Sequence, residues 1–390
     1  MNEFDISAVI RSLKSVLPEQ DALISLHEPQ FSGHEWEYLK DCLDTTYVSS
    51  VGKYVDRFEE ELKAYTGVKH VIAVVNGTAA LHICLKVVGV EPNDEVLIPT
   101  LTFIATANAV RYCGATPHFI DSDRSTLGVD THKLDAYLKD ISEIRTEGCF
   151  NKMTGHRIKA AMPMHTYGHP VDLDPIVEIC NRYKLELVED AAESLGSFYK
   201  GRHTGNWGKA SALSFNGNKV ITTGGGGAIL TNDDELAKLA KHLTTTAKVH
   251  HKWSFVHDQI GFNYRMPNIN AALGCAQLEG LPSAIKNKRK LAEEYKHAFT
   301  GVNGINFFTE PSFAQSNYWL NVLLLDNKFF EQRDLLLELT NAHGIMTRPA
   351  WTLMHQLDMY ENCPRMDDLA AAENLEKCLI NIPSSAKLGF

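Results

Sequence analysis

The sequence is short of positive charge and of long apolar runs. Its 38 lysines and arginines face 48 aspartates and glutamates, giving a formal charge of −10, which argues against a chain built to wrap nucleic acid. No stretch approaches the roughly 18 apolar residues that a membrane-spanning helix needs, so we expect no membrane partner. The first residues, "MNEFDISAVIRSLKSVLP", carry acidic side chains and no continuous apolar region, unlike a secretory signal.

Several common site motifs are also missing. The eight cysteines are scattered without a CxxC pair, so we expect reduced thiols in a cytoplasmic protein. Neither GxGxxG before a helix nor GxxxxGK[ST] occurs, which makes a Rossmann or P-loop site a poor hypothesis. His165 and His169 have HxxxH spacing, but Gly168 and Pro170 would break a helix there, so we expect no metal site.

The hydrophobic pattern indicates two kinds of architecture along the chain. Residues 5–17 predict a docked surface helix with Asp5 as its cap and Pro18 as its stop. From about residue 55, apolar strands alternate with helices, which is typical of an α/β fold with a largely parallel sheet. After about residue 258 comes a long helix, bent or broken near Pro282, and then the strands and helix of a smaller α+β lobe.

The expected division of the chain has three parts. They are an N-terminal helical extension (1–28), a large domain (29–258) and a small C-terminal domain (259–390).

Two polar features follow apolar strands. In "VVNGTAALHI", Gly77 and Thr78 open a helix, where free backbone N–H groups attract anions such as phosphate. In "LELVEDAAESLGS", Asp190 ends a strand, where open α/β sheets bind ligands. A buried carboxylate there needs a cationic partner. Each motif has an ordinary structural explanation as well: a capped helix in the first case, and a helix-capping acid in the second, where Glu193 fits a helix start equally well.

A third feature is the single lysine in "SALSFNGNKVITTGGGGAIL". Lys219 lies between two apolar segments rather than on an evidently exposed face. Such surroundings lower a lysine pKa and favour a nucleophilic amine. The glycines that follow allow close backbone approach to a ring or to another subunit. A phosphate cradle, a strand-end aspartate and a partly buried lysine together suit pyridoxal phosphate, and Phe103 offers a face for its ring.

Six motifs in order resemble the DegT/DnrJ/EryC1/StrS family. They are "NGTAAL", "PTLTFIATANAVRYCGATPHFID", "MHTYGHPVDLDPI", "VEDAAESLGSFYKG", "SFNGNKVITTGGGGAIL" and "GFNYRMPNINAALGCAQLEGL". The resemblance extends from about residue 28 to the end of the chain. It implies an aspartate aminotransferase fold (type I) with a large, mixed, mostly parallel sheet domain and a small α+β domain. It also implies a sugar-nucleotide aminotransferase that uses pyridoxal phosphate and passes through pyridoxamine phosphate.

The resemblance assigns roles to particular residues. Lys219 is the expected Schiff-base lysine and proton shuttle, and Asp190 the expected partner of the pyridine nitrogen. The other implied cofactor residues are Phe103 as the stacking aromatic, Glu193 near the ring hydroxyl, Gly77, Thr78 and Ser214 at the phosphate, and Asn263 at the phosphate of the neighbouring subunit. This last assignment implies a homodimer with shared sites. Candidate substrate contacts are His165, Arg265, Arg348 and His355.

Within the family, the chain is similar to enzymes that aminate C4 of 4-keto-6-deoxy sugar nucleotides for bacterial surface glycans, such as O-antigen, with L-glutamate as the amino donor. Its N-terminal extension resembles the legionaminic and bacillosamine branch more than the perosamine branch. We therefore expect UDP-4-keto-6-deoxy-N-acetylglucosamine as substrate, with GDP-4-keto-6-deoxymannose as the alternative. Two further hypotheses are a sugar dehydratase, against which the intact Lys219 counts, and a non-catalytic assembly protein with this fold.

Overall fold

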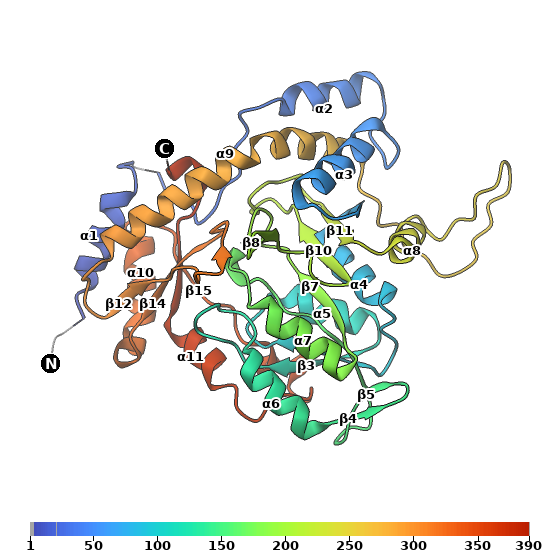
Figure 1. Ribbon diagram of the computed structural model, residues 1–390. Coiled ribbons are helices and arrows are strands. Elements are labelled where there is room, and N and C mark those ends of the chain that lie inside the picture. The colour runs from blue at the N-terminus through green and yellow to red at the C-terminus, as the bar shows by residue number, and fades with distance from the viewer. Residues whose placement is uncertain (1–3, 21, 390) are drawn as a thin grey trace.

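A computed structural model describes residues 4–20 and 22–389. The chain forms two lobes, and the long helix α9 (Asn268–Ala298) runs across both along the top of Figure 1. No helix among the described residues is long and apolar enough to cross a bilayer.

Within the described residues, the larger lobe contains a nine-stranded mixed sheet with the main order β1-β11-β10-β7-β6-β2-β3. Its strands are β1 (His70–Val74), β2 (Glu95–Pro99), β3 (Thr116–Ile120), β4 (Ser142–Arg145), β5 (Gly148–Asn151), β6 (Arg157–Ala161), β7 (Glu186–Asp190), β10 (Ala210–Ser214) and β11 (Gly227–Thr231). Neighbours from β10 to β3 are parallel, whereas β11 is antiparallel to both β10 and β1. The expected largely parallel sheet is thus confirmed, and the carboxyl ends of β1, β10, β7, β6 and β2 share one edge.

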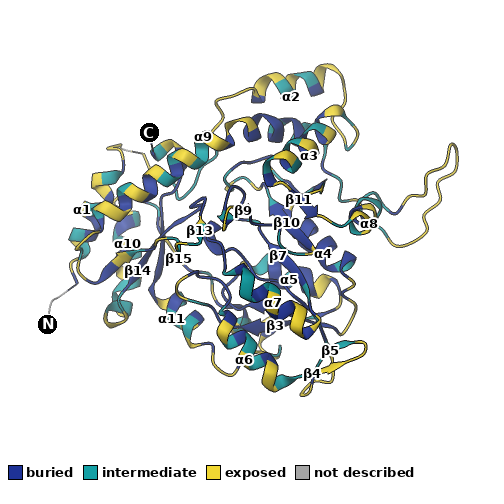
Figure 2. Ribbon diagram, viewed as in Figure 1, coloured by how far each residue is buried: buried dark blue, intermediate teal, exposed yellow. Residues whose placement is uncertain are grey.

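Helices cover both faces of this sheet. Successive strand side chains point to opposite faces, so Ile72 and Val74 join one core while Val71 and Ala73 join another. The first core packs against α4 (Gly77–Val87), α5 (Ile104–Tyr112) and α8 (Asp234–Thr244). The opposite face packs against α2 (Glu35–Asp44), α3 (Lys53–Thr66), α6 (Thr131–Ile141), α7 (Leu173–Tyr183) and the first half of α9. Figure 2 shows the sheet as the most continuously buried part of the lobe.

The smaller lobe is built on a four-stranded antiparallel sheet in the order β12-β14-β16-β15. Its elements are β12 (Ile305–Phe307), β14 (Asn321–Leu325), β15 (Arg348–Pro349), β16 (Leu379–Ile382), α10 (Arg333–Ala342) and α11 (Ala370–Cys378). Helix α1 (Ile6–Val16) docks here, as expected: Val9 and Leu13 share a core with Tyr295 of α9, and Asp5 caps the helix by accepting a bond from the Ala8 N–H at 3.0 Å.

The helix expected to be bent or broken near Pro282 is not broken, because α9 continues through this residue as one helix of 31 residues. A proline inside a helix removes one backbone hydrogen bond. Here its ring lies on the exposed side, while the neighbouring Leu278 and Leu281 are buried in the core of the large lobe. Packing on the buried side therefore outweighs the missing bond.

Segments that follow residue 258 cover both outer strands of the large sheet. Along β1, the Val75 N–H donates to the Tyr264 carbonyl at 2.9 Å, and the chain pairs again at Arg265. Along β3, Phe119 exchanges backbone bonds with Pro364 and Met366, at 2.9 and 3.0 Å. The division into 1–28, 29–258 and 259–390 stays a prediction. The two lobes are linked by α9 and by these two backbone strips, residues 264–266 along β1 and residues 364–366 along β3.

Candidate active site

The sheet topology brings the predicted residues to one edge. Asp190 ends β7 and Ser214 ends β10, while Gly77 follows β1 and Phe103 follows β2. Lys219 lies in the loop that leads into β11, which is antiparallel and therefore starts at this same edge. Four segments that are distant in sequence, near residues 77, 103, 190 and 214–219, thus meet where open α/β sheets bind ligands.

The start of α4 is suited to a phosphate. Asn76 caps the helix by accepting a bond from the Ala79 N–H at 2.8 Å. The first helical N–H groups, those of Gly77 and Thr78, have no intrahelical acceptor, and the helix dipole favours an anion beside them. A Cβ on Gly77 would lie 2.8 Å from the Cβ of Ser214. Only a glycine therefore allows the Ser214 hydroxyl to approach this helix end.

The run of four glycines, Gly224 to Gly227, also allows a close approach to the start of α4. A Cβ on Gly227, the first residue of β11, would lie 2.6 Å from the Asn76 carbonyl, closer than any real side chain tolerates. Gly224 has a φ of +80°, which glycine adopts without strain. We expected the glycines to admit a ring or another subunit. Within this chain, Gly227 admits the backbone at the start of α4.

Lys219 lies between an acid and an aromatic ring. Its amino group donates to Glu193 Oε1 at 3.0 Å and lies 3.8 Å from the centroid of the Trp319 ring. The Lys219 side chain is 13% exposed. The Trp319 indole N–H donates to the carbonyl of Asn218 at 2.7 Å, which ties the ring to the loop that carries the lysine. The expected partial burial of Lys219 is present.

Glu193 is buried inside the site, and both of its carboxylate oxygens accept a hydrogen bond. One carboxylate oxygen accepts the Lys219 bond, and the other accepts the Tyr167 N–H at 2.9 Å. Burial raises the pKa of Glu193 to about 7, against the lowering influence of Lys219. This carboxyl therefore changes its charge near neutral pH, in direct contact with the candidate nucleophile.

Asp190 is buried, and its hydrogen-bond donors among the described residues are neutral groups. Its Oδ2 accepts from the Thr106 hydroxyl at 2.6 Å and its Oδ1 from the Ala192 N–H at 3.2 Å. Burial raises its pKa, and these bonds and Lys219 oppose that shift. A buried carboxylate is costly unless a cation accompanies it. A protonated ring nitrogen is such a cation, so the donor set of Asp190 fits a pyridine ring.

A row of aromatic rings lines the site. Phe103 is 47% exposed, and its ring centroid lies 6.0 Å from that of Trp351. Trp351 lies 4.8 Å from Tyr167, which lies 6.4 Å from Trp319. Phe103 thus presents a free face, as expected of a residue that stacks on a cofactor ring. The sequence did not reveal the other three rings, nor Thr106.

The four candidate substrate residues have different surroundings. Arg348 is exposed and lines a cavity of about 610 Å³ together with His27, Asn218 and Trp319. Arg265 pairs with the backbone of Val74, and its Nε atom is buried without a hydrogen-bond partner among the described residues. Arg348 donates to the Asn341 side chain at 3.1 Å and to the Thr347 carbonyl at 2.8 Å, and a substrate contact of either arginine stays a prediction.

The two histidines are already engaged. His165 is fully buried, and its ring nitrogens contact Glu189 at 3.1 Å and the Val171 N–H at 3.3 Å. The structure gives His165 a supporting position behind β7 rather than one in contact with a substrate. His355 shares a hydrogen bond with the Thr100 hydroxyl at 2.7 Å, and burial lowers its pKa.

The described residues contain no cluster of three or more side chains suited to a metal ion. His169, the second histidine of the HxxxH pair, packs edge-on against Phe308 and Tyr318. Burial lowers its pKa to about 3, so it is a neutral core residue.

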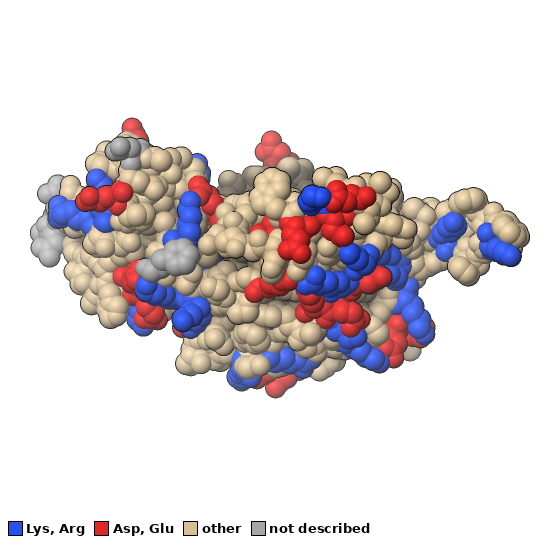
Figure 3. Space-filling view, turned by 90° about the horizontal axis from the view of Figure 1, so that it is seen from above, with Lys and Arg blue, Asp and Glu red and all other residues tan. Residues whose placement is uncertain are grey.

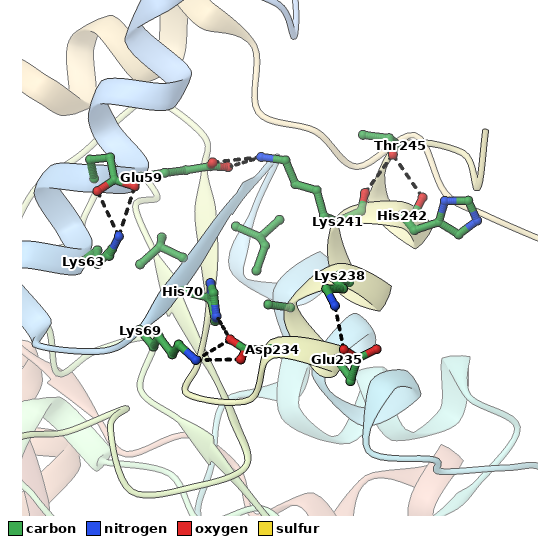
Figure 4. A pocket seen from close by; sticks show the side chains of 14 residues that line it. Glu59, Lys63, Lys69, His70, Asp234, Glu235, Lys238, Lys241, His242 and Thr245 are labelled. Atoms are coloured by element: carbon green, nitrogen blue, oxygen red, sulfur yellow. Dashed lines mark hydrogen bonds and ion pairs between the residues drawn. The ribbon is translucent and has the colours of Figure 1, made fainter. Parts of the chain in front are cut away.

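Another surface hollow lies away from these residues. It has a volume of about 790 Å³ and lies between α3, β1 and α8 (Figure 4). Its cations have acidic partners: Lys241 contacts Glu59, and both Lys69 and His70 contact Asp234. It contains none of the predicted site residues.

A long arm protrudes beyond α8. It comprises residues 246–262 and is seen at the right of Figures 1 and 3. Its tip exposes 75% of Trp253 and 81% of Phe255, and basic side chains are visible on it in Figure 3. Asn263 is exposed at the base of this arm and bridges Thr245. The expected role of Asn263 at the phosphate of a neighbouring subunit stays a prediction.

Comparison with known proteins identifies the class to which this geometry belongs. The model of the DegT/DnrJ/EryC1/StrS aminotransferase family matches residues 29–389. GDP-perosamine synthase of Caulobacter vibrioides is 38% identical over 368 residues, which cover 94% of each chain. The putative pyridoxal phosphate-dependent aminotransferase EpsN of Bacillus subtilis is 35% identical over 371 residues, covering 94% of this chain and 92% of EpsN.

A solved structure agrees with these matches. The aminotransferase PseC of Helicobacter pylori, involved in pseudaminic acid biosynthesis, superposes with a TM-score of 0.84 at 26% identity, covering 93% of this chain and 94% of PseC. The chain therefore belongs to the DegT/DnrJ/EryC1/StrS aminotransferase family. It is an enzyme of the pyridoxal phosphate-dependent class, and its phosphate cradle, buried Asp190 and enclosed Lys219 fit that cofactor.

Proposed function

We propose that the enzyme moves an amino group from L-glutamate to C4 of a nucleotide-linked 4-keto-6-deoxy sugar. The observation that carries this proposal is the placement of Lys219, in contact with Glu193 and Trp319, at the sheet edge that also carries Asp190. The aromatic row and the cavity beside it supply room and apolar faces for a sugar ring.

The chain's own residues divide the work. Pyridoxal phosphate, when bound, supplies an aldehyde carbon that accepts the amino group and a ring that withdraws electrons. Gly77, Thr78 and Ser214 would hold its phosphate, Phe103 would cover its ring, and Asp190 would keep its ring nitrogen protonated. Lys219 would bind it and, once released, move a proton to and from the reacting carbons.

Glu193 is the acid in contact with that amine. As a carboxylate it attracts a neighbouring cation, and as a neutral acid it no longer does so. Because the pKa of Glu193 is about 7, both of its charge states are accessible near neutral pH. Glu193 can therefore take up or release a proton beside Lys219.

Two substrates each have a supporting observation. The perosamine synthase of C. vibrioides and that of Escherichia coli O157:H7 are both 38% identical to this chain, which supports GDP-4-keto-6-deoxymannose. The N-terminal extension, which lies before the family match at residue 29, led us to expect UDP-4-keto-6-deoxy-N-acetylglucosamine. The two compounds share the reacting C4 ketone, and we propose both as candidate substrates.

We also propose a homodimer with shared sites, in the cytoplasm, serving surface-polysaccharide synthesis. The apolar tip of the arm and the exposed Asn263 at its base support the dimer, because the described part of the chain leaves the large apolar side chains at this tip exposed. The free cysteines support a reducing compartment.

The test begins with the visible spectrum of the purified, cofactor-loaded protein. L-glutamate should bleach the colour, and each of the two keto sugars should then be offered to the aminated form, with products identified by mass spectrometry. A mass gain that replaces the ketone by an amine supports the proposal and names the nucleotide. Loss of the sugar hydroxyl without amination would identify a dehydratase, and no response to any amino donor would leave only the assembly role.

A further inference from the structure

A second lysine lies behind the site. Lys288, in the middle of α9, is among the largest fully buried side chains of the described residues. Its ammonium donates to the carbonyl of Trp319 at 3.2 Å and to the carbonyl of Ser384. Within the described part of the chain, it forms no ion pair with a carboxylate. A fully buried lysine without an acidic partner is rare and costly.

The two carbonyls belong to neighbouring strand ends of the small lobe. Trp319 precedes β14, Ser384 follows β16, and these strands pair at Asn321 and Ile382. The Ser384 hydroxyl also accepts the Asn321 N–H at 2.7 Å. Lys288 therefore holds together the two strand ends at which the chain passes between the small sheet and the site.

The contacts continue from there to the candidate nucleophile. The ring of Trp319 lies against the Lys219 amine at 3.8 Å, and its indole N–H holds Asn218, the residue next to Lys219. Lys288, Trp319 and Lys219 thus form one uninterrupted chain of contacts across the two lobes.

We propose that Lys288 is a positioning residue: it holds the main chain of Trp319 so that the indole face lies against the Lys219 amine and favours its charged form. The inference rests on the proposed function only for the use to which that amine is put.

The physical basis is the attraction of a cation to an aromatic face, which is strongest for tryptophan. Lys288 can hold both carbonyls in either protonation state, because an ammonium has three donors and a neutral amine has two. Burial lowers its pKa to about 7. Three other titratable groups act on this region. Glu193 and Asp190 attract the Lys219 cation. The third group is His27, whose pKa is lowered by burial and by both lysines.

The experiment measures the protonation of Lys219 in the full chain freed of cofactor. A small acylating reagent is applied across a pH series, and modification of Lys219 is quantified by peptide mass spectrometry, which gives a pH midpoint for this one amine. Lys288→Met keeps the length of the side chain but removes its donors. Lys286→Met, an exposed position on the same helix, is the matched control.

Lys288→Met should lower the Lys219 midpoint by about half to one pH unit, while Lys286→Met leaves it unchanged. Trp319→Leu should lower it similarly, and the double variant should lower it no further than Trp319→Leu alone. If Lys288→Met lowers the melting temperature but leaves the midpoint unmoved, Lys288 is structural only and the proposal is wrong. Additive shifts in the double variant would also overturn it.

If Lys288→Met does not fold, Trp319→Leu still tests the proposal. An unchanged pH midpoint of Lys219 in Trp319→Leu would show that the indole face does not favour the charged amine. The outcome is independent of the proposed reaction. If the protein aminates neither sugar but shows these midpoint shifts, the positioning role of Lys288 stands. If the enzyme is active but the shifts are absent, the positioning role is wrong.

Discussion

The amino group of Lys219 lies 3.0 Å from Oε1 of Glu193. The two residues come from different loops at one sheet edge, and the acid is the more deeply buried of the two. The contact places a group that titrates near neutral pH beside the candidate nucleophile. Three testable predictions concern this contact and its surroundings, and a fourth concerns the protruding arm.

Replacing Lys219 by alanine should abolish the visible colour that free glutamate bleaches and reduce amination by at least about 10²–10⁴-fold, the usual contribution of a positioned acid–base group. Lys200→Ala, at an exposed ion pair with Asp174, serves as the control and should retain both. Borohydride labelling followed by peptide mapping checks the assignment. A label on any other lysine would show that Lys219 is not the attachment site.

Asp190→Asn should leave a folded protein that still binds the cofactor but turns over slowly, because a neutral amide cannot keep the ring nitrogen protonated. Thr106→Val removes a 2.6 Å hydrogen bond to the same carboxylate and should cost less, about tenfold for a bond to a charged group. Steady-state kinetics and the cofactor spectrum measure both effects. Equal turnover in Asp190→Asn and wild type would exclude the proposed partnership.

Glu193 should make the cofactor-free chain less stable as pH rises. Burial raises its pKa from 4.5 to about 7, so the folded chain holds this proton more tightly than the unfolded chain. Stability therefore falls between about pH 4.5 and 7, by up to about 3 kcal/mol, and is level above that range. Melting temperatures of wild type and Glu193→Gln should diverge across this window.

The control for that measurement is Glu178→Gln, at an exposed position on α7, which should follow wild type at every pH. A melting temperature of Glu193→Gln that tracks wild type across the window would mean that Glu193 keeps an ordinary pKa in the folded chain.

The exposed tip of the arm should be needed for dimer formation. The double variant Trp253→Ser, Phe255→Ser is expected to sediment as a monomer at concentrations where wild type is dimeric, because two large apolar side chains lose their burial on association. Met153→Ser, another exposed apolar side chain far from the arm, should remain dimeric. A dimer that survives the double variant would assign its interface to another surface.

Much of this site could be predicted because its residues follow strands. Asp190, Gly77 and Lys219 each lie directly beside an apolar segment, and a parallel sheet necessarily brings the carboxyl ends of its strands together. Trp319 was not found because it stands at the start of "YWLNVLLL", where a tryptophan is expected in the core. Tyr167 and Thr106 have no local signal of their own, since their roles depend on the packing of Glu193 and Asp190.

For His165, the sequence predicted a substrate contact, whereas the structure buries this side chain. A histidine after a strand fits a ligand contact, but its partner Glu189 faces the same buried space behind β7, and sequence alone does not say which side of the strand a neighbouring loop will fill. Of the bend or break expected near Pro282, the break was wrong for a similar reason. Local propensity disfavours a proline inside a helix, whereas tertiary packing on the other side of α9 maintains it.

The strips at 264–266 and 364–366 seal the outer strands β1 and β3. An unsealed strand offers its free N–H and C=O groups to any other chain and invites aggregation. A fragment that stops at residue 258 would expose two such templates at once, so the large lobe cannot be expected to remain monodisperse when it is produced alone. During synthesis, its sheet stays vulnerable until the last third of the polypeptide has emerged.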